Sequence, residues 1–295
     1  MVCKGNVVMR VVKRKKGNEE YFYLQHSFRK GTKVITKEKY LGKNIPRDLE
    51  EIKNSFRKEL QKELYQKLEK IKDNFQKYWK SLPATVKKKE LEEISIAFTY
   101  NTNAIEGSMI TLEEAREIIQ DHISPNRPLR DVKEAEAHSK VFLEMLGNKK
   151  NSGKVSNKKI LEWHKKIFGN TKEDIAGKYR DYLVRVGSYV APDWQDVKKL
   201  MNNLIKFIVE KNDLNPVELA AIVHYKFEKI HPFGDGNGRI GRLLMNLVLW
   251  NAEYPMLIIE YKNRKSYYRA LEKGEERFVN YFIRRYLAIH GKKFN

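Results

Sequence analysis

Along most of the chain, apolar residues recur every three or four positions, which is the spacing of amphipathic α-helices. In the longest run, between residues 46 and 80, nine apolar residues from Leu49 to Trp79 cover 30 positions in eight steps, a mean of 3.75. A left-handed coiled coil averages about 3.5. The run therefore predicts one amphipathic helix that packs on the protein body, and a homodimer contact through it is the alternative.

The same periodicity predicts a series of shorter helices downstream. Several have recognisable starts: Thr111 is followed by Glu114 in the pattern of a capping box, and Asn215 precedes Pro216 as an N-cap precedes the first helical residue. The expected helices lie at about residues 87–107, 132–147, 156–167, 216–230, 239–250 and 278–289.

Two segments depart from the helical pattern. Within residues 1–45, three stretches rich in β-branched and aromatic residues are separated by turn signals, which predicts an antiparallel three-stranded meander. The stretches are Val7–Val12, Tyr21–Gln25 and Lys33–Tyr40. Near the middle of the chain, residues 183–190 predict a short β-hairpin. The expected fold is mainly α, divided into 1–45 (small basic β meander), 46–81 (long amphipathic linker helix) and 82–295.

The chain is strongly basic, with 59 Lys and Arg against 38 Asp and Glu and a net charge of +21. Residues 1–45 hold twelve of the basic and three of the acidic residues, a net charge of +9. We interpret this as a solvated lysine-rich surface; nucleic-acid binding through the N-terminal meander is the less favoured alternative. With Cys3 as its one cysteine and no long apolar run, the chain is expected to be cytoplasmic, with no membrane association.

The most unusual stretch is His231-Pro-Phe-Gly-Asp-Gly-Asn-Gly-Arg-Ile-Gly-Arg242, between two predicted helices. A glycine-rich loop that begins a helix is a natural anion site, because the first N–H groups of a helix have no internal partner. Arg239 and Arg242 are three positions apart and share one helix face. The stretch therefore predicts a phosphate cradle, with Asp235 placed for a divalent cation and His231 at the rim.

A second stretch that bears on function ends the predicted helix 87–107. Gly107 suits a helix C-terminus, and Glu106 precedes it. A carboxylate at this end of a helix is slightly unfavourable because of the helix dipole. The placement is a mild indication that Glu106 has a task other than stability.

These two stretches resemble the Fic family. The residues from His231 to Arg242 match its signature H-P-F-x-[DE]-G-N-G-R-x-x-R at every specified position, and Thr102, Glu106 and Gly107 match its inhibitory motif [ST]-x-x-x-E-[GN]. Because that motif precedes the signature, the chain resembles the class with an N-terminal inhibitory helix. The resemblance implies that residues 82–295 form an all-helical Fic core with a β-hairpin flap.

The resemblance also implies a protein adenylyltransferase, which moves AMP from ATP to a Ser, Thr or Tyr hydroxyl of a protein docked on the flap. His231 is then the catalytic general base, Asp235 the Mg²⁺ ligand, and Glu106 the residue that pairs with Arg242 to restrain the reaction. Tyr267, with Tyr268 as the alternative, is expected beside the adenine. The full set of expected ATP-binding residues is Val184, Arg185, Val186, Gly187, Asp235, Gly236, Asn237, Gly238, Arg239, Ile240, Gly241, Arg242 and Tyr267.

Two alternatives remain open at this point. The same residues serve a de-AMPylase in some Fic proteins, where the inhibitory glutamate activates water. The other alternative is a nucleic-acid-associated binding protein that uses its basic N-terminus. The kinase-like relatives have Lys where this chain has Gly238, so another nucleotide donor is less favoured.

Overall fold

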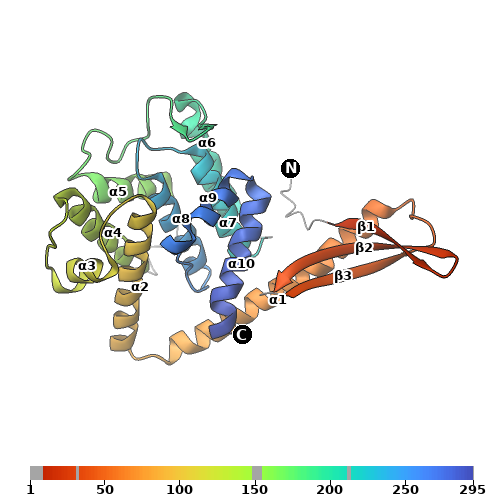
Figure 1. The fold of residues 1–295 in the computed structure, drawn as a ribbon. Helices are drawn as coiled ribbons and strands as arrows, with labels where there is room; N and C mark the ends of the chain where they lie inside the picture. Colours follow the sequence, from red (N-terminus) through yellow and green to blue (C-terminus); the bar gives the residue numbers. More distant parts are fainter. Residues whose placement is uncertain (1–8, 31–32, 148–154, 211–213, 295) are drawn as a thin grey trace. The chain divides into compact units, whose positions relative to one another are not determined.

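The structure, a computed structural model, describes residues 9–30, 33–147, 155–210 and 214–294 (Figure 1). The chain divides into two compact units, Met1–Glu69 and Lys70–Asn295. The dividing point lies inside the long helix α1 (Leu49–Ser81), whereas the sequence suggested divisions at residues 45 and 81. Each unit is described by itself below.

The first unit contains a three-stranded antiparallel sheet in the order β1-β2-β3, which confirms the predicted meander. The strands are β1 (Arg10–Lys16), β2 (Glu19–Lys30) and β3 (Lys33–Gly42). All three reach further toward the C-terminus than the sequence suggested. Val7, Val8 and the predicted turn at residues 31–32 lie outside the described residues.

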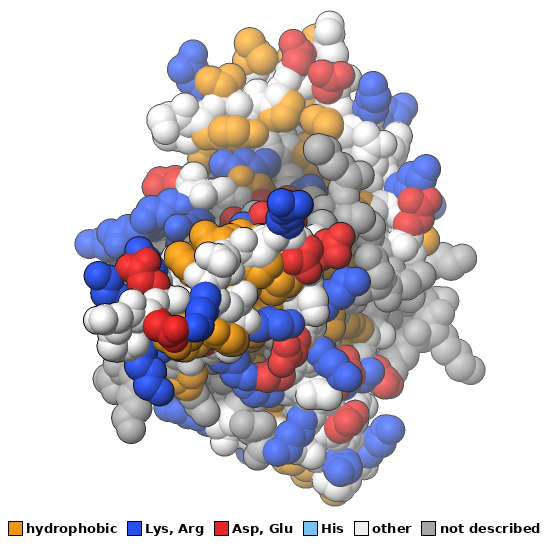
Figure 2. All heavy atoms as spheres, turned by 90° about the vertical axis from the view of Figure 1, so that its right-hand side faces the viewer, with side chains coloured by type: hydrophobic (Ala, Val, Ile, Leu, Met, Phe, Trp, Pro, Cys, Tyr) orange, Lys and Arg blue, Asp and Glu red, His pale blue; other side chains and the backbone are white. Residues whose placement is uncertain are grey.

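Apolar side chains cover one face of this sheet. Leu24 and Leu41 from the strands enclose Phe56 from α1, and all three are buried. On the other face Tyr23 packs against Tyr40, with ring centroids 5.4 Å apart. Figure 2 shows a molecular face on which Lys and Arg side chains are interspersed with Asp and Glu.

Phe56 is expected to carry much of the stability of the first unit. Phe56→Ala should lower its free energy of unfolding by about 3–5 kcal/mol, because a ring that is 4% exposed leaves a cavity when it is removed. Hydrogen exchange at β2 would measure the loss. Lys58→Ala, at an exposed position of the same helix, is the control. Equal protection of β2 in both variants would show that the Phe56 ring does not stabilise the first unit.

The second unit is a helical bundle with one short hairpin, which confirms the mainly α fold. Thr111 forms the predicted capping box with Glu114, and Asn215 caps the helix that follows it. The helices are α2 (Ala84–Ile105), α3 (Leu112–Arg116), the π-helix η1 (Glu117–Asp121), α4 (Leu129–Gly147), α5 (Asn157–Phe168), the 3-10 helix η2 (Trp194–Asp196), α6 (Val197–Glu210), α7 (Pro216–Ile230), α8 (Asn237–Asn251), the 3-10 helix η3 (Tyr261–Asn263), α9 (Arg264–Glu272) and α10 (Glu275–Lys293).

Helix α8 is the centre of this bundle, and α2, α4, α5 and α7 all pack against it (Figure 1). Its residues are buried on nearly every side, as in a helix at the centre of a core. His138 of α4 and His164 of α5 are fully buried in the bundle. Among the residues that the structure describes, none of the helices combines the length and the apolar character needed to cross a bilayer.

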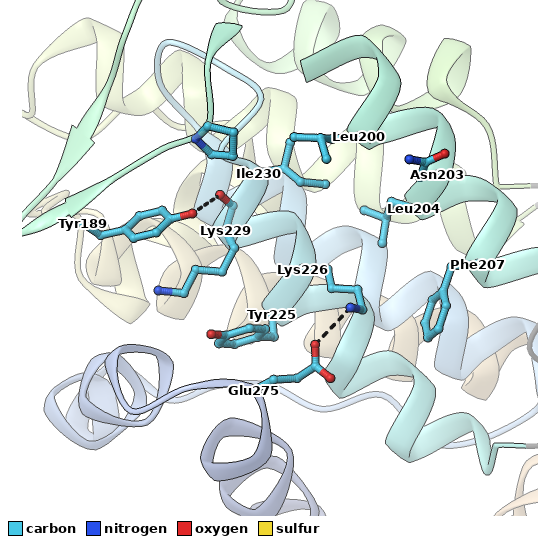
Figure 3. A pocket seen from close by; sticks show the side chains of 11 residues that line it. Tyr189, Leu200, Asn203, Leu204, Phe207, Tyr225, Lys226, Lys229, Ile230 and Glu275 are labelled. Atoms are coloured by element: carbon cyan, nitrogen blue, oxygen red, sulfur yellow. Dashed lines mark hydrogen bonds and ion pairs between the residues drawn. The ribbon is translucent and has the colours of Figure 1, made fainter. Parts of the chain in front are cut away.

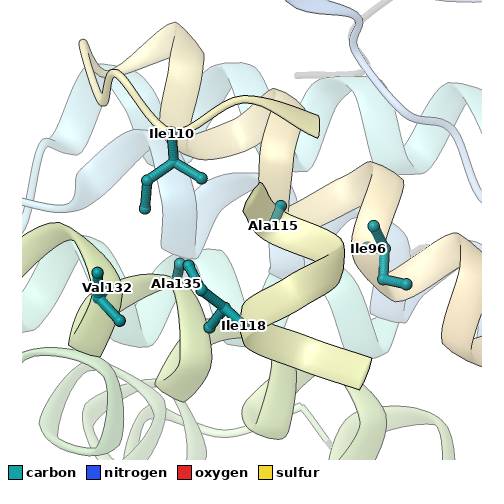
Figure 4. Close-up of a cluster of buried hydrophobic side chains, with 6 residues drawn as sticks. All are labelled: Ile96, Ile110, Ala115, Ile118, Val132 and Ala135. Carbon is teal, nitrogen blue, oxygen red and sulfur yellow. The ribbon is translucent and has the colours of Figure 1, made fainter. Parts of the chain in front are cut away.

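A cluster of aliphatic side chains fixes the helix that bears the inhibitory motif. Ile96 of α2 packs with Ile110, Ala115 and Ile118 from the segment after it, and with Val132 and Ala135 of α4 (Figure 4). This cluster joins α2 to α4 and lies before the C-terminal turn of α2. The turn that carries Thr102 and Glu106 is therefore supported on a packed core.

Candidate active site

His231 ends α7 with a left-handed backbone conformation, φ 49°. Its carbonyl oxygen accepts a hydrogen bond from Nε of Arg180 at 2.8 Å. The Arg180 side chain is buried and also donates to the carbonyl oxygens of Tyr182 and Pro192, at 2.8 and 2.6 Å. One guanidinium thus ties the end of α7 to both ends of the hairpin segment. Arg180 was not among the residues predicted from the sequence.

The surroundings of His231 favour its neutral form. Burial lowers the pKa of the imidazole below its usual value, although the backbone of Glu228 and the charges of Glu106 and Asp235 oppose this. A neutral imidazole at pH 7 has a free lone pair and can accept a proton. His231 is therefore in the protonation state that a general base requires.

The loop between α7 and α8 is held by its own side chains. Asn237 accepts a hydrogen bond from the N–H of Phe233 at 2.9 Å and donates to the carbonyl of the same residue at 2.8 Å. Gly236 takes φ 78°, and a Cβ there would lie 2.4 Å from the Phe168 ring. Asn237 and Gly236 therefore shape the loop, which turns the first N–H groups of α8 toward the site.

The expected contact between Glu106 and Arg242 is present. Nη2 of Arg242 lies 2.6 Å from Oε1 of Glu106, across 136 positions of sequence. Thr102 completes the pocket: its hydroxyl accepts from Nε at 2.6 Å and its carbonyl from Nη2 at 3.1 Å. Burial alone would lower the pKa of the guanidinium, but the Glu106 carboxylate outweighs it and the pKa is raised. Arg242 is thus a buried cation held by the last turn of α2.

The Glu106 carboxylate also lies against the first turn of α8. A Cβ at Gly238 would be only 2.1 Å from Oε1 of Glu106 and 2.9 Å from Nη1 of Arg242. Only glycine allows this approach. Because a helix N-terminus favours negative charge, the carboxylate occupies a place suited to an anion such as phosphate. Gly107, with φ 95°, ends the turn that carries the carboxylate there.

The first arginine of the signature, Arg239, has a different partner. Arg239 is buried, forms an ion pair with Glu134 of α4 and lies over the Phe168 ring, with its Cζ 4.4 Å from the centroid. Nζ of Lys172 lies 2.9 Å from Glu134 and 2.7 Å from Oδ2 of Asp235. Four charged groups therefore alternate in sign beside the loop. Glu134 and Lys172 were missed in the sequence, where neither belongs to a motif.

Asp235 suits the role of a single carboxylate ligand. Its side chain is 48% exposed. Burial would raise its pKa, but the hydrogen bond from Lys172 and the charge of Arg239 outweigh this, so the pKa is lowered and the group is ionised at neutral pH. Among the described residues, no cluster of three or more His, Cys, Asp or Glu could hold a metal ion. Mg²⁺ commonly binds one or two carboxylates together with substrate phosphates, so Asp235 fits such an ion only in the presence of a nucleotide.

The sequence of this chain is similar to sequences of known proteins. Residues 154–249 match the Fic/DOC family. The chain therefore contains a Fic/DOC domain. It is 34% identical over 204 residues to protein adenylyltransferase Fic of Nematostella vectensis, and 30% identical over 214 residues to protein adenylyltransferase fic-1 of Caenorhabditis elegans. These alignments cover 67% and 71% of this chain but 47% and 42% of the relatives, so the chain spans less than half the length of the curated relatives it matches.

Solved Fic structures share the fold. Fic-1 of C. elegans (residues 134–508) superposes with a TM-score of 0.68 at 25% identity, over 83% of this chain and 74% of that one. A Fic-domain signaling protein of Bacteroides thetaiotaomicron superposes with a TM-score of 0.65 at 26% identity, over 78% and 98%. The Fic fold therefore extends well beyond the 96 residues from 154 to 249 into the N-terminal helices of the second unit.

Two adjacent tyrosines of the Fic domain differ in accessibility. Tyr267 is 1% exposed, and its hydroxyl lies 2.8 Å from Nε2 of His224 and 3.4 Å from Nη1 of Arg242. Tyr268 is 40% exposed, and its hydroxyl donates to the carbonyl of Ile105 at 3.3 Å. Tyr267 thus supports Arg242 from within the core, and Tyr268 is the ring that solvent reaches.

The flap is a small hairpin of β4 (Arg185–Val186) and β5 (Tyr189–Val190), with Gly187 at φ 59° in its turn. Val184 extends the pairing at the base of the hairpin, because its carbonyl accepts from the N–H of Ala191 at 3.0 Å. Two further predicted site residues, Ile240 and Gly241 near the C-terminal end of the signature, pack inward. Ile240 is fully buried, and a Cβ at Gly241 would lie 3.0 Å from three atoms of α7.

Glu228 is a buried acid that the sequence did not single out. It lies on α7 three residues before His231, and its side chain is 15% exposed. Its Oε1 has no hydrogen-bond partner among the described residues and lies 3.9 Å from Nε2 of His224. Burial raises the pKa of Glu228 to about 7; Arg242 opposes the rise and Glu106 adds to it. Glu228 is thus close to half ionised at neutral pH.

Glu228 should make stability depend on pH. Since its pKa is higher in the folded chain, the stability it contributes is complete below the unfolded pKa and is lost as pH rises toward 7. Glu228→Gln removes this loss. As the pH rises from 4.5 to 8, the free energy of unfolding of the variant should therefore increase by up to about 3 kcal/mol relative to that of the parent. Urea unfolding at both pH values would measure the gain. Glu272→Gln, at an exposed position, should show none; a difference that did not change with pH would contradict the assignment.

Proposed function

We propose that this chain is a protein adenylyltransferase that transfers AMP from ATP to a hydroxyl group of a protein, and that Glu106 restrains the reaction. One observation carries the proposal: the Glu106 carboxylate lies on Arg242 at the N-terminus of α8, where a phosphate of ATP would bind. A carboxylate and a phosphate compete for the same guanidinium and the same N–H groups. The names of the relatives, protein adenylyltransferases, support this direction.

The reaction assigns a task to each part of the site. His231, neutral at pH 7, takes the proton of the target hydroxyl as its oxygen attacks the α-phosphorus. The bond from that phosphorus to the β-phosphate oxygen breaks, and pyrophosphate leaves. The N–H groups that begin α8 at Asn237 and Gly238 stabilise the charge on the α-phosphate, and Arg242 holds the outer phosphates once Glu106 has moved.

Asp235 would hold Mg²⁺, which would supply positive charge to the phosphates of the nucleotide. Lys172 now neutralises Asp235, with its Nζ 2.7 Å from Oδ2, and has Glu134 as its other partner. If Lys172 releases Asp235, the lysine therefore remains paired with Glu134. Arg239 stays paired with Glu134 and keeps the loop fixed. Tyr268 is the accessible ring for the adenine.

The protein target would dock on the flap. Large apolar side chains stand exposed around the hairpin: Tyr182, Leu183, Val186, Val190 and Trp194 are each at least 40% exposed. A short hairpin with free edges pairs with an extended segment through main-chain groups, which is tolerant of sequence. The exposed apolar residues then give the segment side-chain contacts beside His231.

The position of the label on ATP tests the reaction. Glu106→Gly protein should become labelled by ATP that carries radioactive phosphorus at the α-position and stay unlabelled by ATP labelled at the γ-position. Intact-mass measurement should show the addition of one AMP residue for each modified site. Labelling from the γ-position would instead indicate phosphoryl transfer, and no labelling from either position would reject the proposal.

The reverse reaction is a second candidate, favoured by the position of Glu106. Its side chain is 28% exposed and its charge acts on His231, so it is placed to activate a water molecule in the same site. A target modified beforehand with AMP should then be hydrolysed by the parent chain and not by Glu106→Gly. Hydrolysis by both forms would remove Glu106 from this role.

A further inference from the structure

A cavity of about 430 Å³ lies on the side of α7 that faces α6 and the first turn of α10 (Figure 3). Tyr189 of the flap and Pro192, which follows the flap in the sequence, belong to its lining. None of the residues assigned above to nucleotide binding lines it. The cavity therefore has no task in the proposed chemistry of the phosphates.

The lining combines an apolar floor with two cations. Leu200 and Leu204 of α6 and Ile230 of α7 provide the apolar part. Lys226 is already paired, with its Nζ 3.1 Å from Glu275. Lys229 lies over the Tyr189 ring, 4.1 Å from the centroid, and has no carboxylate partner among the described residues. The cavity thus suits an apolar side chain that has a carboxylate beside it.

The cavity is continuous with the flap and with the catalytic end of α7. The hydroxyl of Tyr189, in β5, donates to the carbonyl of Lys229 at 2.8 Å, which fixes the hairpin to α7 (Figure 3). Lys229 and Ile230 directly precede His231. An extended segment that pairs with the flap and presents a hydroxyl to His231 would therefore run near this cavity, because successive residues of a strand advance only about 3.3 Å.

We propose that this cavity selects the protein target: it binds an apolar or aromatic side chain near the modified hydroxyl, and Lys229 pairs with an Asp or Glu adjacent to that side chain. This inference rests on the proposed adenylyltransferase function and names the class of substrate. The occupant is the target segment itself. A target with a basic residue at that place is disfavoured, because its charge would lie against Lys229.

Synthetic peptides test this selection. Each peptide would have an extended sequence with one Tyr hydroxyl. A Phe–Asp, Phe–Lys or Gly–Gly pair would be placed in turn at each number of residues from this Tyr. The full chain with Glu106→Gly and α-labelled ATP should modify the best Phe–Asp peptide at least about fivefold more efficiently than its Phe–Lys counterpart, the effect of a charge pair near a protein surface. Lys229→Glu in the same background should reverse the order of these two peptides.

Lys198→Glu provides the matched control, since Lys198 is exposed on α6 and is not in the cavity lining. This variant should keep the parental preference for Phe–Asp. A chain that labels itself but modifies all peptides equally, or none of them, would overturn the inference. So would a preference that Lys229→Glu leaves unchanged. Failure of the proposed function is distinct, because the chain would then not label itself from α-labelled ATP.

Discussion

Replacing His231 is expected to lower AMP transfer by about 10²–10⁴-fold, the usual contribution of a general base. The effect should be measured in the Glu106→Gly background, where the restraint is absent. Burial of the ring lowers its pKa, so the imidazole is neutral and ready to take the hydroxyl proton at pH 7. A variant without a base at this position retains the phosphate-binding groups and loses the proton transfer.

The choice of substitution matters because His231 has φ 49°. Alanine in the left-handed region is strained by about 1–2 kcal/mol, whereas asparagine tolerates it, so His231→Asn removes the base with less change in the backbone. Both variants should bind ATP with the affinity of the Glu106→Gly parent, measured by equilibrium titration. Full activity of His231→Asn would show that the ring takes no proton.

The pH profile gives an independent measure of the same group. Because the pKa of His231 is lowered, kcat/KM of the Glu106→Gly chain should be flat around pH 7–8 and fall only as pH drops below the usual histidine pKa of about 6.5. The neutral form, present above the pKa, is the active one. The residual activity of His231→Asn should lack this acid limb, and an identical limb in both would assign the titration to another group.

Local patterns in the sequence predicted most elements of the fold. The apolar periodicity predicted the helices because each buries one face, and the capping residues Thr111, Ser156 and Asn215 mark helix starts because their side chains satisfy free N–H groups. The signature could be recognised in the sequence because its residues are contiguous. Its glycines at 236 and 238 are required by a left-handed conformation and by the approach of Glu106.

Contacts between distant residues left no such pattern. Glu134 and Lys172 lie in separate segments, and nothing in their neighbourhoods indicates that they meet Arg239 and Asp235. Arg180 binds backbone carbonyls, which every sequence possesses. The pairing of Glu106 with Arg242 was expected from the family resemblance alone, since 136 positions separate the two residues. Tyr267 and Tyr268 are neighbours on α9, and their sequence does not reveal which ring faces the core.

Releasing Arg242 is the second change with a large expected effect. Glu106→Gly should raise AMP transfer by about 10- to 150-fold, because a hydrogen bond to a charged group contributes about 1.5–3 kcal/mol and a tenfold rate corresponds to 1.36 kcal/mol. The substitution removes the carboxylate from Nη2 of Arg242 and frees the first turn of α8. Initial rates of labelling from α-labelled ATP, with the parent and the variant at equal concentration, would measure the increase.

Glu106→Gln separates charge from bulk. Glutamine has nearly the size of glutamate but makes a neutral hydrogen bond, about half as strong as a charged one. If the charge holds Arg242, Glu106→Gln should show part of the increase in AMP transfer expected for Glu106→Gly. If the side chain only fills the nucleotide site, the Glu106→Gln variant should remain as inhibited as the parent. Glu113→Gln, at an exposed position of α3, controls for the loss of one negative charge.

The partner of Glu106 can be tested in the same way, because the restraint and the activity converge on Arg242. Arg242→Ala should be inactive with or without Glu106, since the outer phosphates lose their guanidinium in both cases. The gain from Glu106→Gly should therefore vanish in the Arg242→Ala background, a departure from additivity expected of residues in direct contact. An undiminished gain there would mean that Glu106 restrains the reaction without Arg242, through its position at the N-terminus of α8.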